Sequence, residues 1–282
     1  MPGPLMRVEI AYNHGKLRHR LVSEAMRDGV GRLGDFPVPV SPHGPRPDGL
    51  ICYGWCDPAT EYRRRRLPVL TMDMPWFNRL HPTNPASCVK ISVNHWHPTA
   101  YFQRRPKPTD RWEKISLPIL PMRGNGRHIV VAGSGPKSSV RDGNEFQAWE
   151  REIIRALPDF TSREIVYRPK PYMKDSAPPQ IEGARMDRDT PIAGLLTDAW
   201  AVVTRQSNVA VDALRLGIPV FCWEGVGSVL AMQNLADIER PFLPTDEQRQ
   251  QFFADLAYCQ WTMAELKSGA AWAHIKDEGV FA

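Results

Sequence analysis

The segment AWAVVTRQSNVAVDALRLGIPVFC runs from Ala199 to Cys222 and decides the fold. It starts with an apolar run, continues with the polar pentapeptide Thr204–Asn208, and then becomes periodic and apolar again. Gly217 and Pro219 end the periodic part, and a second apolar run follows them. This order predicts a buried strand, a polar turn, a helix and a second buried strand. Such a unit is typical of a parallel α/β sheet.

Other apolar runs extend this α/β interpretation along the chain. In the first half, strands are expected at Arg7–Tyr12, Pro47–Gly54, Leu67–Asp73 and Val89–Val93, with a helix from Leu17 to Gly31. In the second half, a strand from His128 ends in a glycine-rich loop, a helix covers Asn144–Leu157, a strand covers Glu164–Pro171, and helices cover Glu247–Ala257 and Trp261–Lys267. Strands that alternate with helices favour a parallel sheet.

The stretch Pro98–Gly126 is rich in proline and glycine and predicts a linker. We therefore expect an N-terminal domain, residues 1–120, and a C-terminal domain, residues 121–282. Residues 1–125 contain 19 Lys and Arg against 10 Asp and Glu, whereas residues 126–282 contain 17 against 21. A basic first half favours a polyanionic partner or surface, and uneven solvated charge is the alternative interpretation.

Several classes of protein are not expected from this composition. No run of 18 apolar residues occurs, so no membrane span is predicted. Five scattered cysteines and the absence of a signal-peptide pattern favour a cytoplasmic protein with free thiols. No cluster of His, Cys and Asp has metal-ligand spacing, so no metal is expected, and we attribute the D-x-D pattern at Asp187–Asp189 to chance.

Three predicted strand ends in the second half carry residues that suit a phosphate group. They are Gly133, Ser134, Gly135, Lys137 and Ser138, then Arg168 and Lys170, and finally Arg205, Gln206, Ser207, Asn208 and Asp212. Glycines let a backbone approach a phosphate, cations add charge, and Ser207 or Asn208 can cap the following helix. Because ligands bind at the carboxyl ends of strands in open α/β sheets, a nucleotide site is expected here. Ordinary loops and solvated charges are the alternative.

In the first half, the general-base candidates are Asp73 and His14. Residues expected to bind an acceptor are Asn13, Lys16, Arg63, Arg64, Arg65, Arg66, Trp76, Arg79, Asn94, His95, Trp96 and His97. If the sheet is parallel, the loops after its strands converge on one cleft. Most single acids and histidines in loops are structural, and runs of arginine are usually solvated.

The C-terminal half resembles the donor half of GT-B glycosyltransferases. The pattern T-x-x-S-x-V-x-x-x-A-L-x-x-G-x-P-V recurs in capsule-polysaccharide-type transferases and their phage relatives, and it is matched here by Thr204, Ser207, Val209, Ala213, Leu214, Gly217, Pro219 and Val220. The YRPKP segment is similar to the R-x-H/K-P segment of the family, whereas the usual E-x7-E signature is absent. The resemblance implies two Rossmann-like domains that face each other across a cleft.

This resemblance implies a nucleotide-sugar-dependent glycosyltransferase, with a UDP-sugar as the expected donor in the C-terminal domain. The acceptor would bind mainly to the basic N-terminal domain. Because phage enzymes that glycosylate 5-hydroxymethylpyrimidines share this architecture, the expected acceptor is duplex DNA in the cytoplasm of a phage-infected bacterium. Trp76 or Trp96 would then line the gap that a flipped base leaves. The alternatives are a capsule or surface-glycan transferase, and a nucleic-acid-binding module with a degenerate nucleotide site.

Overall fold

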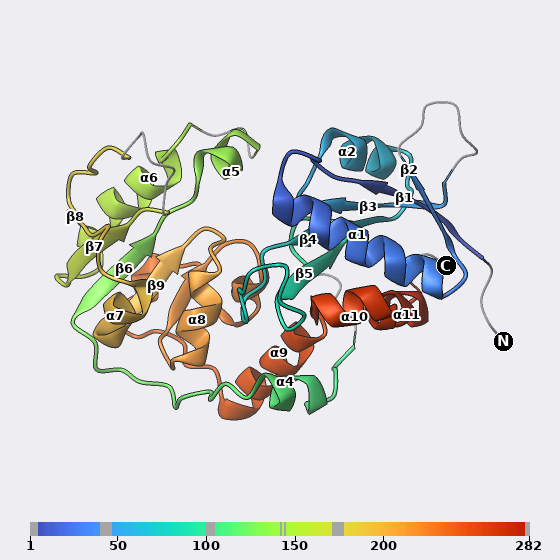
Figure 1. Ribbon diagram of the computed structural model, residues 1–282. Helices are drawn as coiled ribbons and strands as arrows, with labels where there is room; N and C mark the ends of the chain where they lie inside the picture. Colours follow the sequence, from blue (N-terminus) through green and yellow to red (C-terminus); the bar gives the residue numbers. More distant parts are fainter. Residues whose placement is uncertain are drawn as a thin grey trace. The chain divides into compact units, whose positions relative to one another are not determined.

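The structure is a computed structural model that describes residues 5–39, 47–99, 105–141, 143, 145–170 and 178–279. The chain forms two compact units (Figure 1). Unit 1 consists of Met1–Ile115 and Ala254–Ala282, and unit 2 consists of Ser116–Phe253. Each unit contains one β-sheet, so the predicted α/β class is confirmed.

Six strands form the sheet of unit 1, in the order β11-β5-β4-β3-β1-β2. Their bounds are β1 (Arg7–Ala11), β2 (Phe36–Pro39), β3 (Gly49–Tyr53), β4 (Val69–Asp73), β5 (Cys88–Val93) and β11 (Gln260–Thr262). β1 to β4 run parallel, whereas β5 and β11 run antiparallel to their neighbours. The carboxyl ends of β1 to β4 therefore share an edge with the amino end of β5.

Helices cover both faces of this sheet (Figure 1). Within the described residues, the helices of unit 1 include α1 (Leu17–Arg32), α2 (Asp57–Arg64), α4 (Asp110–Ile115), α10 (Met263–Ser268) and α11 (Ala270–Asp277). α1, α10 and α11 share one core, and α2 packs against the other face. Side chains alternate along a strand, so Ile51 belongs to the first core and Cys52 to the second. Gly29 lets α1 approach α10 closely, because a Cβ there would lie 2.0 Å from the Leu266 carbonyl oxygen.

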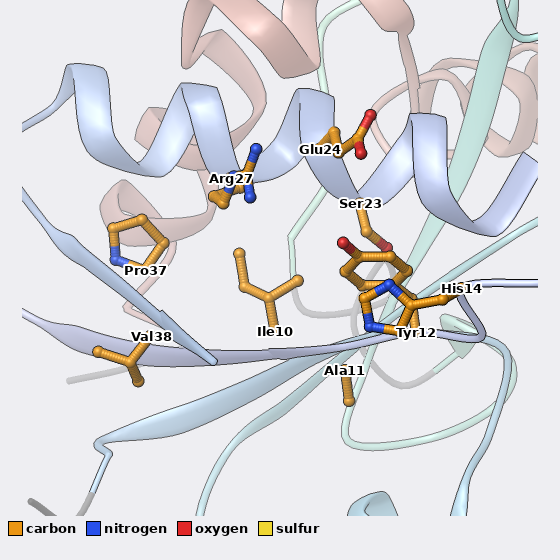
Figure 2. A pocket seen from close by; sticks show the side chains of 9 residues that line it. All are labelled: Ile10, Ala11, Tyr12, His14, Ser23, Glu24, Arg27, Pro37 and Val38. Carbon is orange, nitrogen blue, oxygen red and sulfur yellow. The ribbon is translucent and has the colours of Figure 1, made fainter. Parts of the chain in front are cut away.

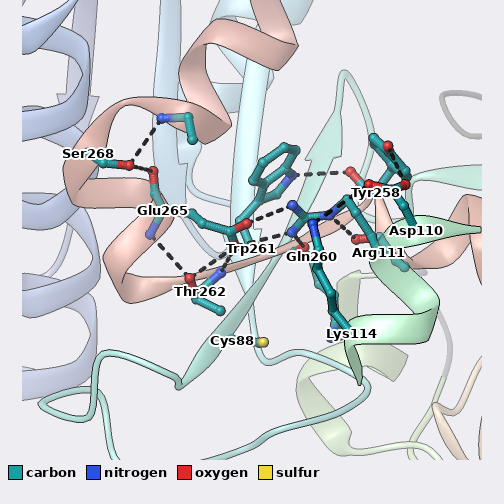
Figure 3. Close-up of polar contacts among 12 residues, drawn as sticks. Cys88, Asp110, Arg111, Lys114, Tyr258, Gln260, Trp261, Thr262, Glu265 and Ser268 are labelled. Atoms are coloured by element: carbon teal, nitrogen blue, oxygen red, sulfur yellow. Dashed lines mark hydrogen bonds and ion pairs between the residues drawn. The ribbon is translucent and has the colours of Figure 1, made fainter. Parts of the chain in front are cut away.

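Arg111 of α4 attaches the C-terminal segment to unit 1 (Figure 3). Its guanidinium lies 2.6 Å from a carboxylate oxygen of Glu265 and donates to the carbonyl oxygen of Gln260 over 3.0 Å. It also lies 3.9 Å from the ring centroid of Trp261. The predicted C-terminal domain, residues 121–282, was therefore wrong in its last part, because residues 254–282 belong to unit 1.

The sheet of unit 2 contains five strands, in the order β10-β9-β6-β7-β8, and all of them run parallel. They are β6 (His128–Ala132), β7 (Glu164–Arg168), β8 (Arg185–Met186), β9 (Ala199–Thr204) and β10 (Val220–Cys222). The helices are α5 (Pro136–Arg141), α6 (Ala148–Ala156), α7 (Ile192–Thr197) and α8 (Val209–Arg215), with 3-10 turns at Leu157–Asp159, Val226–Leu230 and Leu235–Asp237. α9 (Asp246–Ala257) begins in unit 2 and ends in unit 1.

Part of the predicted linker packs tightly on unit 2. The Leu120 amide donates to the Arg215 carbonyl oxygen, and the Arg123 amide donates to the Gly217 carbonyl oxygen. Gly217 has a φ of 73°, and a Cβ on it would lie 1.9 Å from the Pro121 carbonyl oxygen. The glycine that ends α8 is therefore required both by its backbone angle and by the chain that passes over it.

Three elements of unit 2 differ from the predicted secondary structure. β8 and α7 occur in and after the polar stretch that follows β7. α6 begins at Ala148, and the proposed cap Asn144 lies outside the described residues.

In the described part of the chain, no helix has the length and apolar character that crossing a bilayer requires.

Candidate active site

The sheet of unit 2 has one point at which its strand order reverses. From β6 the chain continues to β7 and β8, and then returns to the other side of β6 to form β9 and β10. Open parallel sheets bind ligands at such switch points, outside the carboxyl ends of the strands. The loops after β6 and β9 meet here, because Thr204 Oγ1 donates a hydrogen bond to the Ala132 carbonyl oxygen over 2.8 Å.

Backbone amides of the loop after β6 donate hydrogen bonds to residues outside the loop. The Gly133 amide donates to the Arg168 carbonyl oxygen over 2.9 Å, and the Ser134 amide donates to the carboxylate of the buried Glu150 over 2.6 Å. A Cβ on Gly133 would lie 2.9 Å from the Tyr167 hydroxyl oxygen, so a larger residue would displace the loop. These two amides bond within the protein, which removes them from the set expected to bind a phosphate.

Lys170 lies against this loop, whereas Arg168 does not. A Cβ on Gly135 would lie 3.2 Å from Lys170 Cδ and 3.9 Å from its Nζ. The Arg168 guanidinium instead donates to the Asp187 carbonyl oxygen, after β8, over 3.0 Å. The expected pair of cations therefore has different partners, and Lys170 is the member beside the β6 loop. The Lys137 side chain lies outside the described part of the structure.

The loop after β9 contains the predicted residues Arg205 to Asn208. Ser207 Oγ accepts a hydrogen bond from the Val209 amide over 3.3 Å, whereas the Asn208 side chain makes no capping bond to α8. Of the two predicted caps, Ser207 is the one that acts. The Arg205 guanidinium pairs with Glu224, after β10, over 2.9 Å. Asp212 is the fourth residue of α8, and Ser138 lies in α5.

Two tryptophans in unit 2 were not singled out from the sequence. The rings of Trp149 and Trp223 pack edge to face with centroids 5.4 Å apart. Trp223 directly follows β10, beside Glu224. Its place at a strand end is the signal that could have identified it, because the same reasoning selected the other three loops.

The sheet of unit 1 also reverses its strand order, because β2 and β3 lie on opposite sides of β1. His14 follows β1, and its ring centroid lies 4.3 Å from that of Tyr12. Asp73 ends β4 at the same edge. The two predicted general-base candidates therefore lie at one edge, as do Asn13, which bonds the Gly15 amide, and Lys16, which precedes α1.

A cavity of about 620 Å³ opens at this edge, between α1 and the ends of β1 and β2 (Figure 2). Tyr12 and His14 line one part of it, and Ser23, Glu24 and Arg27 line it from α1. Asp73 does not belong to its lining. The cavity therefore distinguishes the two general-base candidates.

Asp73 instead faces Lys90, which sequence reasoning missed. β5 runs antiparallel to β4, and its Lys90 is in register with Asp73, so that Nζ lies 3.6 Å from the Asp73 carboxylate. Lys90 is only 3% exposed, and its Nζ lies 5.7 Å from the Trp76 ring centroid and 5.9 Å from that of Trp96. The signal was a single charged residue in the apolar strand CVKISV, since buried lysines require a partner.

The carboxylate of Asp73 is held from other sides as well. Its Oδ1 accepts a hydrogen bond from the Met74 amide over 2.7 Å. Burial, followed by the negative charge of Asp73, raises the pKa of the Tyr53 phenol, so that phenol stays protonated. Asp73 is thus held by the Lys90 cation and by the Met74 amide.

Two solved structures share this fold over almost the whole chain. Both are of KpsC from Thermosulfurimonas dismutans. One is described as a beta Kdo 2,4 transferase; it has 14% identity and a TM-score of 0.53, covering 90% of this chain and 91% of that chain. The other is described as a beta Kdo 2,7 transferase; it has 12% identity and a TM-score of 0.52, covering 96% and 99%. The chain has the GT-B fold.

The GT-B fold confirms the fold class predicted from the segment Ala199–Cys222. No protein-family model and no curated protein matches the sequence. At the identities of the two KpsC structures, the shared property is the fold. The roles of individual residues in this GT-B chain therefore depend on the geometry described above.

The prediction that Asn94, His95, Trp96 and His97 follow a parallel strand was wrong. β5 is antiparallel, so its end lies at the opposite edge of the sheet, where the Asn94 side chain accepts a hydrogen bond from the Val69 amide. Asn94 and His95 therefore do not lie with Asp73. The chain then turns back, which brings Trp96 to Lys90, and His97 is buried.

The run of four arginines also lies away from the carboxyl edge. Arg63 and Arg64 end α2, Arg65 and Arg66 follow it, and the next residues lead to the amino end of β4. Arg64 pairs with Glu61 over 2.9 Å. These arginines therefore do not lie with His14, because a helix after a parallel strand returns the chain to the opposite edge, and their contact with an acceptor stays a prediction.

Two further acceptor candidates have structural contacts. Trp76 is 3% exposed, so its ring is not available to replace a flipped base. The Arg79 guanidinium donates to the Pro75 carbonyl oxygen over 2.9 Å.

In the D-x-D pattern, Asp187 accepts a hydrogen bond from the Thr190 amide and closes a turn. Within the described ranges, no group of three or more His, Cys, Asp and Glu residues is arranged to hold a metal ion.

Proposed function

We propose that this chain is a glycosyltransferase that moves a sugar from a nucleotide-sugar to a hydroxyl group of an acceptor. The observation that carries the proposal is the switch point of unit 2, where the β6 and β9 loops are joined by the bond from Thr204 to Ala132. Lys170 lies over the same β6 loop. The fold of the two Kdo transferases supports this assignment.

The donor would bind at this edge of unit 2. Gly135 lets a phosphate approach the backbone, and Lys170 supplies a positive charge next to it. Ser207, Asn208 and Asp212 follow β9 and would contact the rest of the nucleotide-sugar. We expect a UDP-sugar as donor. During transfer, Lys170 would stabilise the negative charge that develops on the departing phosphate.

In unit 1, His14 is the better placed of the two general-base candidates. His14 lines the cavity beside α1, whereas Asp73 is paired with Lys90. His14 would accept the proton of the acceptor hydroxyl as its oxygen bonds to the anomeric carbon. The bond between that carbon and the phosphate oxygen breaks, and the nucleoside diphosphate departs with the electron pair.

Two acceptor classes are consistent with this chemistry. The likeness to two Kdo transferases supports a capsule or surface glycan. A 5-hydroxymethylpyrimidine in DNA is the second candidate, and net charge is the observation that favours it. Unit 1 contains 20 Lys and Arg against 14 Asp and Glu, and unit 2 contains 16 against 17. The difference in net charge between the two units is smaller than the difference between residues 1–125 and residues 126–282. The reason is that the acidic segment 254–282 belongs to unit 1.

The test is release of nucleoside diphosphate from UDP-, GDP-, CMP- and dTDP-sugars, without acceptor, with capsular oligosaccharides, or with hydroxymethylated duplex DNA; for a CMP-sugar the released product is the monophosphate. The expected result is release from one donor class that increases when one acceptor is added. If no donor is turned over with either acceptor and none binds in calorimetry, the proposal is wrong.

Lys170→Ala tests the donor site. We expect the donor KM to rise about tenfold, because a charge-assisted contact with a phosphate is lost. The matched control is Lys267→Ala, which removes an exposed lysine from α10 of unit 1. Equal donor KM values for the two variants would show that the donor binds elsewhere.

A further inference from the structure

The cavity beside α1 has a lining that is chemically mixed. Ile10, Pro37 and Val38 make its apolar part, and the rings of Tyr12 and His14 border it (Figure 2). Binding sites for small molecules are typically apolar and aromatic, with a few polar groups that fix the orientation of the ligand. At about 620 Å³, the cavity has room for a sugar ring.

Ser23 supplies a buried polar group without a partner. The residue has no exposed surface, and its Oγ makes no hydrogen bond to any described residue. Figure 2 shows its side chain pointing from α1 toward the Tyr12 ring. A buried hydroxyl that lacks a hydrogen bond is unfavourable, so a ligand hydroxyl that bonds to it would be selected once the side chains that cover Ser23 move aside.

Glu24 and Arg27 add one negative and one positive charge to the same wall. Neither forms an ion pair with another residue in the described part of the chain. A carboxylate accepts hydrogen bonds and a guanidinium donates them, so together they suit neighbouring hydroxyl groups. Because their formal charges cancel, they do not favour a polyanion.

We infer that this cavity binds the terminal sugar of a glycan acceptor, as an uncharged hexose ring whose hydroxyls bond to Ser23, Glu24 and Arg27. The apolar face of the ring would pack on Tyr12, and one hydroxyl would face His14. This inference rests on the proposed function and narrows its acceptor to a saccharide. The same wall has no net positive charge to attract the phosphates of a DNA nucleotide, so a saccharide is the acceptor that it favours.

Saturation-transfer NMR on the full chain tests this inference through binding alone. The probes are methyl glucoside, methyl galactoside, methyl mannoside and a trinucleotide that contains 5-hydroxymethylcytosine. We expect saturation of at least one hexoside, and about tenfold weaker binding in Arg27→Ala and in Ser23→Ala. The matched control Arg20→Ala removes an exposed arginine of the same helix that does not line the cavity.

Three results would overturn the inference: no hexoside is saturated, the trinucleotide is saturated in their place, or the hexoside binds both variants as well as wild type. Arg27 is exposed, so Arg27→Ala keeps the test valid even if Ser23→Ala disturbs the fold. Since the readout requires no donor, sugar binding without any turnover would count against the proposed transfer reaction and not against the cavity.

Discussion

The surroundings of His14 and Asp73 differ, although both lie at one edge of unit 1. His14 contacts the Tyr12 ring and lines a cavity, while Asp73 is bonded to the Met74 amide and lies 3.6 Å from Lys90. A general base needs access to the hydroxyl whose proton it takes. We therefore expect His14→Gln to lower kcat by about 10²–10⁴-fold, measured as release of nucleoside diphosphate, with an unchanged donor KM.

The matched control for His14→Gln is Asp73→Asn. This change removes the carboxylate of the other candidate but keeps the shape of its side chain. We expect a smaller loss in kcat than for His14→Gln, because the change weakens only the contact between Asp73 and Lys90. If Asp73→Asn abolishes turnover while His14→Gln retains it, Asp73 is the base. Thermal unfolding of both variants would separate this result from a loss of folded protein.

Among the elements of unit 1, α11 is attached to the sheet by one buried carboxylate. Asp35 directly precedes β2, and it accepts hydrogen bonds from the Met6 amide over 2.8 Å and from Trp272 Nε1 over 2.6 Å. It also lies 2.8 Å from Nζ of Lys276 in α11. Burial opposes ionisation, but the bonds from Lys276, Trp272 and Met6 prevail and lower the pKa of Asp35 below its ordinary value of 3.8.

Asp35→Asn should lower the free energy of unfolding by about 2–3 kcal/mol near neutral pH, because it leaves buried donors poorly paired. A lowered carboxyl pKa contributes stability that is fully present above the unfolded pKa and is lost as pH falls through the folded pKa. The difference between wild type and variant should thus shrink below pH 3.8, the ordinary value for this group. Urea unfolding at neutral and acidic pH measures it; an equal difference at both would contradict the role of Asp35.

The strands show where sequence reasoning succeeded and where it could not. Long apolar runs such as Val69–Asp73 were identified because hydrophobic pattern is local. β2 (FPVP) and β8 were not predicted from the sequence, because they are short or rich in proline and their pairing depends on strands far along the chain. The direction of β5 was also not visible in its sequence. That one reversal moved Asn94 to the opposite edge and brought Lys90 to Asp73.

For the whole molecule, unit 2, which we propose to bind the donor, was easier to predict than unit 1. The loops after β6, β7 and β9 each follow a parallel strand. Their common position at the carboxyl edge of the sheet could therefore be predicted from where each strand ends in the sequence. The candidate site of unit 1 depends on side chains from distant segments, and unit 1 includes a C-terminal segment that joins its sheet through β11. No local sequence pattern indicates that β11 pairs with a strand of the first unit. The predicted C-terminal domain therefore included residues 254–282, which belong to unit 1.

The division of the chain gives a prediction for fragments. Residues 1–120 lack β11, α10 and α11, which provide Trp261, Leu266 and Trp272 to the core beneath α1. Without them, that core would be exposed and the edge of β5 would have no partner. We expect this fragment to show no cooperative thermal transition in circular dichroism and to bind a hydrophobic dye.

The matched chain joins residues 1–115 to residues 254–282 through a flexible linker that replaces unit 2. It restores the complete sheet and the core beneath α1, so it should unfold in one cooperative transition with little dye binding. A cooperative transition in residues 1–120 would show that α1 and the first five strands suffice for folding. In that case the C-terminal segment would be an attachment to unit 1 and not part of its folding core.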